Sequence, residues 1–145
     1  MKVFKSRDVK TPERGTPKSA GLDFFIPNDF PQIFLDPGKS LNIPSGIYVK
    51  IPRGYALVAF NKSGVALKHG LQVGACVIDE DYQGEIHQHV TNISNYSCTL
   101  GAGEKLVQFL CIPVKYVPVE VCASKFDLYG GKKSQRGTGA FGSTR

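Results

Sequence analysis

Short apolar segments separated by glycine and proline turns are the feature that most constrains the fold of this chain. Many of these segments are rich in β-branched and aromatic residues, which favour strands over helices. Several short strands at such spacing predict an all-β sandwich, barrel or jelly roll. The expected strands cover 22–27, 39–44, 46–52, 55–60, 75–79, 85–93, 97–100, 105–114 and 117–122.

Helical periodicity is weak nearly everywhere. One short helix is expected over 63–70, in the stretch SGVALKHG, and Gly70 would end it. A length of 145 residues indicates a single domain. The apolar pattern fades from about residue 130, so we expect the folded domain over 1–130 and a flexible C-terminal arm over 131–145.

Charge and cysteine content narrow the function classes. Lysine and arginine exceed the acidic residues by 18 to 12, which suits an anionic partner. The basic residues are not interleaved with aromatic ones, so no nucleic-acid partner is expected. No apolar run approaches membrane-spanning length, and the first ten residues, MKVFKSRDVK, contain no apolar signal region. The four cysteines form no CxxC pair, and we interpret them as reduced, mostly buried thiols of a soluble intracellular protein.

The stretch VIDEDYQGEI (77–86) places three acids directly after a short apolar strand. Like charges in a row repel one another, although a polar turn ending near Gly84 would tolerate them. Tyr82 follows at once, and a carboxylate beside a flat ring suits a general base next to the sugar or base of a ligand. A bend at Gly74, before this stretch, would offer unpaired backbone groups that could read a base edge.

Two further stretches carry polar residues beside apolar ones. Lys62, Ser63 and Gly64 offer a cation, a hydroxyl and a backbone amide at the start of the expected helix, a combination that favours phosphate. The plainer alternative is a helix N-cap. Asp23 stands between two apolar residues near a strand start; it would be a salt-bridge partner or cap, or would contact Mg²⁺ through water.

The stretch RGTGAFGSTR (136–145) contains little that could fill a core. Its glycines allow close approach of backbone to a ligand, while Arg136, Ser143 and Thr144 are typical partners of phosphate oxygens. Phe141 could stack on a flat base. A disordered glycine-rich end is the alternative.

In this order, and with GEKLVQFL (103–110) as a fifth, these stretches resemble the motifs of the homotrimeric dUTP pyrophosphatase (dUTPase) family. IDEDYQGEI and RGTGAFGST are the most specific. The resemblance implies a distorted jelly-roll barrel with at most one short helix, and a homotrimer with active sites at subunit interfaces. It also implies Mg²⁺-assisted hydrolysis of dUTP to dUMP and pyrophosphate, which limits uracil in DNA and supplies dUMP for dTMP synthesis.

The resemblance implies a role for each site residue. Asp79 would orient the attacking water, and Tyr82 would pack on the deoxyribose and exclude UTP. Asp79, Gln108 and Arg136 would be catalytic. The other expected contacts are Cys76 and His87 at uracil, Lys62, Ser63, Gly64 and Gln108 at the phosphates, Asp23 at a water on Mg²⁺, Arg136, Ser143 and Thr144 at the γ-phosphate end, and Phe141 over uracil. Gly142 would also bind substrate.

Departures from the family pattern leave alternatives open. Lys62 stands where the family usually has arginine, and a point charge replaces a two-pronged donor. Cys76 stands where glycine is common. The alternatives are a dCTP deaminase of the same fold, and a regulatory binding protein that uses a dUTPase scaffold to sequester a partner. A viral or phage-infected cell is one candidate host.

Overall fold

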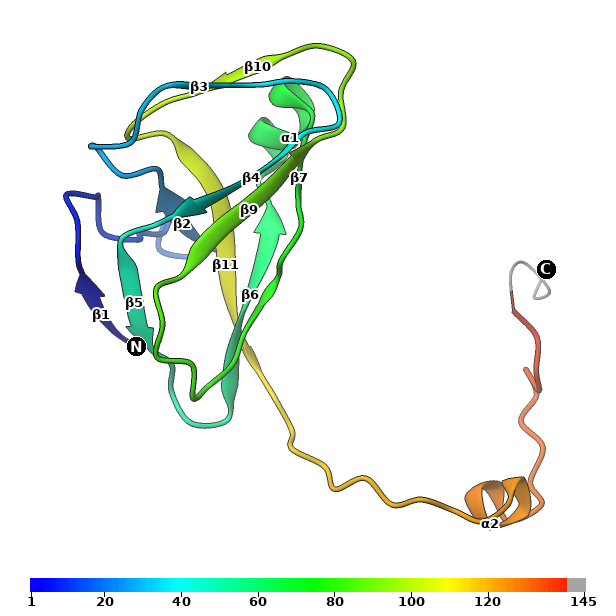
Figure 1. Ribbon diagram of the computed structural model, residues 1–145. Coiled ribbons are helices and arrows are strands. Elements are labelled where there is room, and N and C mark those ends of the chain that lie inside the picture. Colours follow the sequence, from blue (N-terminus) through cyan, green and yellow to red (C-terminus); the bar gives the residue numbers. More distant parts are fainter. Residues whose placement is uncertain (141–145) are drawn as a thin grey trace. The chain divides into compact units, whose positions relative to one another are not determined.

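The computed structural model describes residues 1–140 and divides the chain into two units, residues 1–115 and the part from residue 116 onward. The strands all belong to the first unit. They are β1 (Lys2–Lys5), β2 (Leu22–Phe25), β3 (Ile33–Leu35), β4 (Ser40–Pro44), β5 (Ile47–Lys50), β6 (Tyr55–Asn61), β7 (Leu71–Val73), β8 (Val77–Ile78), β9 (His87–Asn92), β10 (Cys98–Leu100) and β11 (Lys105–Pro113). The all-β prediction is therefore confirmed (Figure 1).

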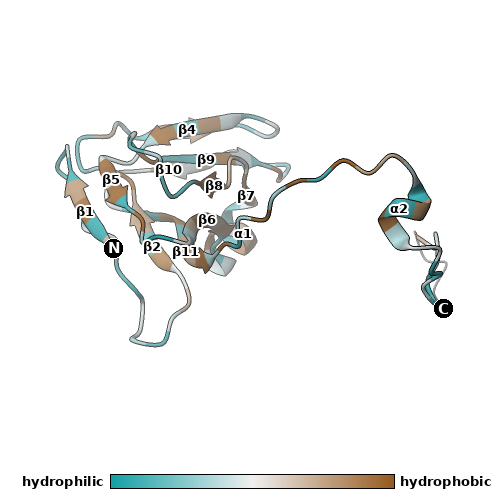
Figure 2. Ribbon diagram, turned by 90° about the horizontal axis from the view of Figure 1, so that it is seen from below, coloured by the Kyte–Doolittle hydropathy of each residue, from teal (hydrophilic) through white to brown (hydrophobic). Residues whose placement is uncertain are grey.

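Two antiparallel sheets form the body of the first unit. One has the strand order β2-β11-β6-β8 and the other β4-β9-β7, while β1 pairs with β5 and β10 with β3. Figure 2 shows β4 and β9 in one layer and β2, β6 and β11 in the other. The core contains fully buried side chains from both layers, including Phe24, Phe109, Ile43 and Val90. The rings of Phe24 and Phe109 meet at 4.5 Å between centroids.

The long strand β11 lies between β2 and β6 and carries a bulge that shapes the site. Its register against β2 shifts between Lys105 and Val107, and the consecutive residues Leu106 and Val107 are both buried. An extra residue in one strand of a pair resets the alternation of side chains. Lys105 and Gln108, three positions apart, can therefore both lie beside the same region of β2.

The helix α1 (Ser63–His69) confirms the expected short helix. It ends at Gly70, which adopts the left-handed conformation at φ 60° and donates its backbone N–H to Ala66. A second helix, α2 (Lys125–Tyr129), makes the prediction of at most one helix wrong. The side chain of Ser124 accepts a hydrogen bond from the Asp127 backbone N–H, so a local N-cap starts this helix without a buried face.

Residues 117–122 form no strand in the described part of the chain, although the sequence predicts one. The valines that create the alternating pattern are exposed, with Val119 and Val121 each at 92%. A strand needs a partner for its backbone groups, and the described residues provide none here. The prediction missed β1, β3 and β7, which are too short or too polar to stand out from their turns.

The cysteines are less buried than the sequence suggests. Cys98 is buried, Cys76 and Cys111 are half-buried, and Cys122 is exposed; all are free thiols. Burial raises the pKa of the Cys98 thiol, and Glu104 adds to the rise. None of the helices in residues 1–140 has the length and apolar character needed to cross a membrane.

Candidate active site

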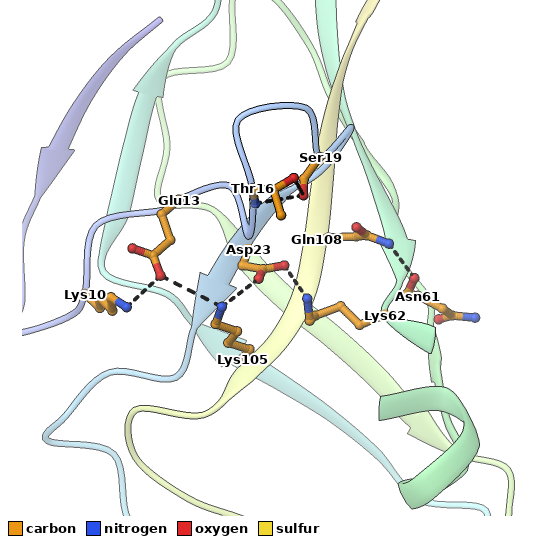
Figure 3. Close-up of polar contacts among 9 residues, drawn as sticks. All are labelled: Lys10, Glu13, Thr16, Ser19, Asp23, Asn61, Lys62, Lys105 and Gln108. Atoms are coloured by element: carbon orange, nitrogen blue, oxygen red, sulfur yellow. Dashed lines mark hydrogen bonds and ion pairs between the residues drawn. The ribbon is translucent and has the colours of Figure 1, made fainter. Parts of the chain in front are cut away.

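Asp23 on β2 is the centre of a cluster of charges (Figure 3). It is only 5% exposed, and its carboxylate bonds the ammonium groups of both Lys62 and Lys105, the latter at 3.0 Å. Burial raises the pKa of Asp23, but hydrogen bonds and charge from Lys62 and Lys105 outweigh burial and hold the pKa below its usual range. Asp23 is therefore a carboxylate at neutral pH and is already occupied by two cations.

The charge cluster continues outward from β2. Glu13 lies 3.8 Å from the Lys105 ammonium and 2.6 Å from the Lys10 ammonium. The Asp23 backbone N–H donates to the Glu13 backbone oxygen at 2.7 Å, which holds the loop before β2 against the strand. These outer pairs are exposed, so each contributes about 1 kcal/mol or less to stability. Glu13 thus connects Lys10 with Lys105, which is one of the two lysines bonded to Asp23.

Gln108 on β11 lies opposite Asp23 in the strand register. Its side-chain N–H donates to the backbone oxygen of Asn61 at 2.8 Å. Gly21 approaches this side chain so closely that a Cβ at position 21 would overlap the Gln108 amide oxygen. Asn61 in turn accepts from the Val73 backbone N–H at 2.7 Å, which ties the end of β6 to β7.

The sequence left open that Ser63 and Gly64 form only a helix N-cap, and the start of α1 does not have that arrangement. Lys62, not Ser63, is the N-cap residue. Its side chain makes no capping bond because a lysine ammonium has no acceptor atom, and it bonds Asp23 instead. Ser63 and Gly64 are exposed at the beginning of the helix. Their hydroxyl and backbone groups therefore face solvent beside the Asp23 cluster, where an anionic ligand can reach them.

A second group of expected site residues lines a pocket of about 320 Å³. Asp79, Tyr82 and His87 line it, together with Asn42, Ala75, Val77, Ile78 and Glu85. Apolar side chains from β8 thus stand beside carboxylates, a phenol and an imidazole. Such a mixture suits a small ligand with a flat apolar face and polar edges.

Asp79 and Tyr82 are held by their turn. The Tyr82 backbone N–H donates to the Asp79 backbone oxygen at 3.2 Å, and the Tyr82 hydroxyl donates to the Glu85 backbone oxygen at 3.0 Å. Gly84 packs so close to the Tyr82 ring that a Cβ would overlap its hydroxyl. The Asp79 carboxylate is exposed and has no bonding partner among residues 1–140. It is available to a ligand or to water.

The sequence predicts unpaired backbone groups at the bend at Gly74, but several of these groups make hydrogen bonds. The Gly74 backbone N–H donates to the His89 backbone oxygen at 3.1 Å, and the Cys76 backbone oxygen accepts from the Ala59 backbone N–H at 2.7 Å. The Cys76 thiol donates to the Gly74 oxygen at 2.8 Å and does not line the pocket. A Cβ at Gly74 would overlap the His89 ring, so only glycine fits against it.

The structure brings the expected residues together in two groups, not one. Asp23, Lys62 and Gln108 form the first, and none of them is among the described residues that line the Asp79 pocket. Arg136 belongs to the second unit, where its side chain donates to the Gly139 backbone oxygen at 2.9 Å. The expected contacts at Phe141, Gly142, Ser143 and Thr144 lie outside the described residues.

Lys105, Asn61 and Asn42 are among the residues of these groups that sequence reasoning missed. Lys105 bonds Asp23, Asn61 bonds Gln108, and Asn42 lines the pocket. Lys105 could have been found, because it precedes Gln108 in the same motif, but the bulge that brings both to one side has no clear sequence signal. No group of three His, Cys, Asp or Glu side chains in residues 1–140 could hold a metal ion unaided.

Comparison with known proteins finds relatives over most of the chain. The dUTPase family model matches residues 7–145. A deoxyuridine 5′-triphosphate nucleotidohydrolase of Pseudomonas putida (strain W619) is 40% identical over 137 residues, covering 90% of this chain and 84% of that protein. A protein of the same name from Finegoldia magna is 32% identical and covers 99% of this chain and 97% of the relative.

Solved structures of phage proteins share the fold. The Staphylococcus bacteriophage 80alpha dUTPase with dUpNHpp superposes with a TM-score of 0.85 at 22% identity, covering 99% of this chain and 97% of that one. A mutant dUTPase from phage phi11 of S. aureus, described with a structural Mg(II) ion, has a TM-score of 0.76 at 21% identity and covers 86% and 97%.

Proposed function

Because this chain belongs to the dUTPase family, we propose that it hydrolyses dUTP to dUMP and pyrophosphate through attack of water on the α-phosphorus. The family's jelly roll agrees with the two-layered all-β fold. The observation that carries the proposal is the exposed Asp79 carboxylate, which lines a pocket beside Tyr82 and bonds no other described residue.

Asp79 orients and deprotonates the attacking water. A carboxylate is ionised at neutral pH and accepts a hydrogen bond from water without first losing a proton. General base catalysis of this kind contributes about 10²–10⁴ in rate. The turn that joins Asp79 to Tyr82 fixes the position of the carboxylate relative to the ring.

Tyr82 and the opposite wall recognise the nucleoside. The Tyr82 ring is braced from behind by Gly84 and by its bond to Glu85, so it offers a rigid surface to the deoxyribose. A 2′-hydroxyl would have to displace this ring, which excludes UTP. Backbone groups near Cys76 and His87 bond the uracil edge, and the closeness of the hairpin leaves no room for a thymine methyl group.

The Asp23 cluster supplies the phosphate contacts. Lys62, Ser63 and Gly64 bind phosphate oxygens with an ammonium, a hydroxyl and backbone, and Gln108 donates an amide N–H. Fixed donors that face the charge developing on the leaving pyrophosphate are the largest contribution expected in such a reaction. Since Asp23 holds Lys62 as a point charge, this contact is less directional than an arginine fork.

A complete site requires more than one copy of the chain. The described lining of the Asp79 pocket does not include the phosphate-binding residues, which supports a homotrimer whose sites form between subunits. Arg136, Ser143 and Thr144 would bind the γ-phosphate end, Gly142 would contact the substrate, and Phe141 would stack over uracil. Closure of such an arm over substrate excludes water from the reacting groups.

The described residues fit a magnesium ion that is held mainly by the substrate. Carboxylate oxygen is the ligand type that Mg²⁺ prefers, and the lowered pKa keeps Asp23 ionised. Both of its oxygens already bond lysines, so Asp23 would accept from a water on the ion while the phosphates supply the other ligands. Bound there, Mg²⁺ would neutralise phosphate charge.

The test is pyrophosphate release from dUTP, dTTP, dCTP and UTP measured side by side with Mg²⁺ present. We expect release from dUTP far above the other three. Ammonia release from dCTP would instead support the deaminase, and nucleotide binding without turnover would support the regulatory binding protein. An intracellular role in keeping uracil out of DNA and supplying dUMP follows from the proposed reaction.

A further inference from the structure

Glu80, the middle acid of the run at 79–81, bonds the backbone of a turn that is distant in sequence. One of its carboxylate oxygens accepts from the Gly54 backbone N–H at 2.6 Å. Glu80 is half-buried, whereas the acids on either side of it, Asp79 and Asp81, are exposed. A hydrogen bond from an N–H to a carboxylate is roughly twice as strong as one between neutral groups. The run of acids is therefore attached to the connection between β5 and β6.

Gly54 is itself held by the strands around it. It adopts the left-handed conformation at φ 80°, and its turn is closed by the Tyr55 backbone N–H, which donates to the Pro52 backbone oxygen at 3.2 Å. The Gly54 backbone oxygen accepts from the Val114 backbone N–H at 2.8 Å, directly after the end of β11. Both backbone polar groups of Gly54 are thus bonded, and Glu80 is attached to a point that is tied to β11.

Glu80 lies on a different side of its turn from the Asp79 pocket. It is not among the described residues that line this pocket, and it lines a neighbouring one together with Val49 and Lys50 of β5. Tyr82 lines both pockets. Since Glu80 does not line the Asp79 pocket, its influence on a ligand there passes through the position of the turn.

A second glutamate of the same motif makes an equivalent bond at the other end of β5. The Glu85 carboxylate accepts from the Gly46 backbone N–H at 2.6 Å, directly before this strand. The Tyr82 hydroxyl donates to the Glu85 backbone oxygen, so the ring is held from this end of the motif. Asp79 is adjacent to Glu80 and is held from the other end. Loss of the Glu80 bond should therefore displace Asp79 more than Tyr82.

We propose that Glu80 is a positioning residue, whose hydrogen bond to Gly54 holds the Asp79 carboxylate in place for the attack of water. The inference rests on the proposed dUTP hydrolysis with Asp79 as the base. A general base has to stay within hydrogen-bond reach of the water that it deprotonates. Displacement of a reacting group by about 1 Å can cost about 10² in rate. The bond to Gly54 limits such displacement, because it joins the residue next to Asp79 to a turn that is tied to β11.

The kinetic test compares Glu80→Met with Glu80→Gln. Both variants remove the charge and keep the approximate length of the side chain, but only glutamine retains an oxygen that accepts from the Gly54 N–H. We expect Glu80→Met to lower kcat for dUTP about tenfold, with KM changed by less than about twofold because Tyr82 keeps its own bond. Glu80→Gln should retain most of the wild-type kcat. Asp81→Ala, which removes the exposed neighbouring acid, should change neither constant.

Amide hydrogen exchange of the free protein, followed by NMR, tests the bond without turnover. We expect the Gly54 amide to exchange about tenfold faster in Glu80→Met than in wild type, and only slightly faster in Glu80→Gln. The Gly46 amide is the matched reference, because it bonds Glu85 at the same distance and should be unchanged in every variant. An unchanged Gly46 amide also shows that the variants are folded.

Three results would overturn the proposal. They are wild-type kcat in Glu80→Met, equal losses of kcat in Glu80→Met and Glu80→Gln, and unchanged exchange of the Gly54 amide in Glu80→Met. Equal losses would mean that the charge of Glu80, not its hydrogen bond, affects turnover. Exchange does not depend on turnover, so wild-type protein that fails to cleave dUTP would contradict the proposed function and not the attachment of Glu80 to Gly54.

Discussion

Two aspartates of the same chain occupy opposite environments. Asp23 is buried, bonds two lysines and has a lowered pKa. The Asp79 carboxylate is exposed at a pocket and bonds no described side chain or backbone group. A carboxylate whose oxygens are already occupied can hold cations in place, whereas an unoccupied one can accept a proton from water. This difference supports our proposal that Asp23 organises the site and that Asp79 reacts.

Asp79→Asn should produce the largest effect on turnover. The amide keeps the shape of the side chain but cannot act as a base, so kcat should fall by about 10³ while nucleotide binding and the free energy of unfolding stay unchanged. Pyrophosphate release and calorimetric titration with dUpNHpp measure the two properties. Asp81→Asn, an exposed acid two residues away, is the matched control. Equal activity of Asp79→Asn and wild type would reject the role of base.

Arg136→Ala should cause the next largest loss. We expect turnover to fall by about 10², because a charged donor at the γ-phosphate end would be missing, with no change in stability. Lys133→Ala, an exposed cation nearby, serves as the control in the same assay.

Deletion of residues 136–145 should lower turnover at least as much while the trimer persists in sedimentation. Full activity of the truncated protein would contradict the role of the arm.

Asp23→Asn should act on stability more than Asp79→Asn does. Loss of the carboxylate leaves the ammonium groups of Lys62 and Lys105 without their counter-ion, and we expect a loss of about 2 kcal/mol in the free energy of unfolding. Urea unfolding measures this loss, and Asp79→Asn is the control. If the two variants unfold at the same urea concentration, the proposed difference between the aspartates is wrong.

The smallest predicted effect is the dependence of the Asp23 contribution on pH. The pKa of Asp23 is lower in the folded state, so its contribution is fully present above the ordinary value of 3.8 and declines as pH falls below it. The stability difference between wild type and Asp23→Asn should therefore be constant from pH 7 to about pH 5 and shrink in more acidic buffer. A difference that shrinks above pH 5 would point to another group.

Most of the fold could be predicted because its signals are local. The run of short strands and Gly70 at the end of α1 depend on neighbouring residues, and both are present in the structure. The absent strand at 117–122 shows the limit. An alternating apolar pattern states that a segment can pair, but the partner is set by the tertiary fold.

The site could be predicted in its residue types but not in its contacts. The motifs identify Asp23 and Asp79 as site candidates without distinguishing their environments, because Lys105 reaches Asp23 only through the bulge in β11. Asn42 lies 45 positions before His87, and only the pairing of β4 with β9 brings them together. Both contacts depend on strand register, which short motifs do not encode.

The most direct test of the central claim is a crystal structure of this protein with the uncleaved analogue dUpNHpp. We predict the α-phosphorus beside the Asp79 carboxylate with a water between them, and the phosphate chain on Lys62 and Gln108 from another copy of the chain. A nucleotide bound away from Asp79, with its phosphates in contact with neither Lys62 nor Gln108, would contradict the account.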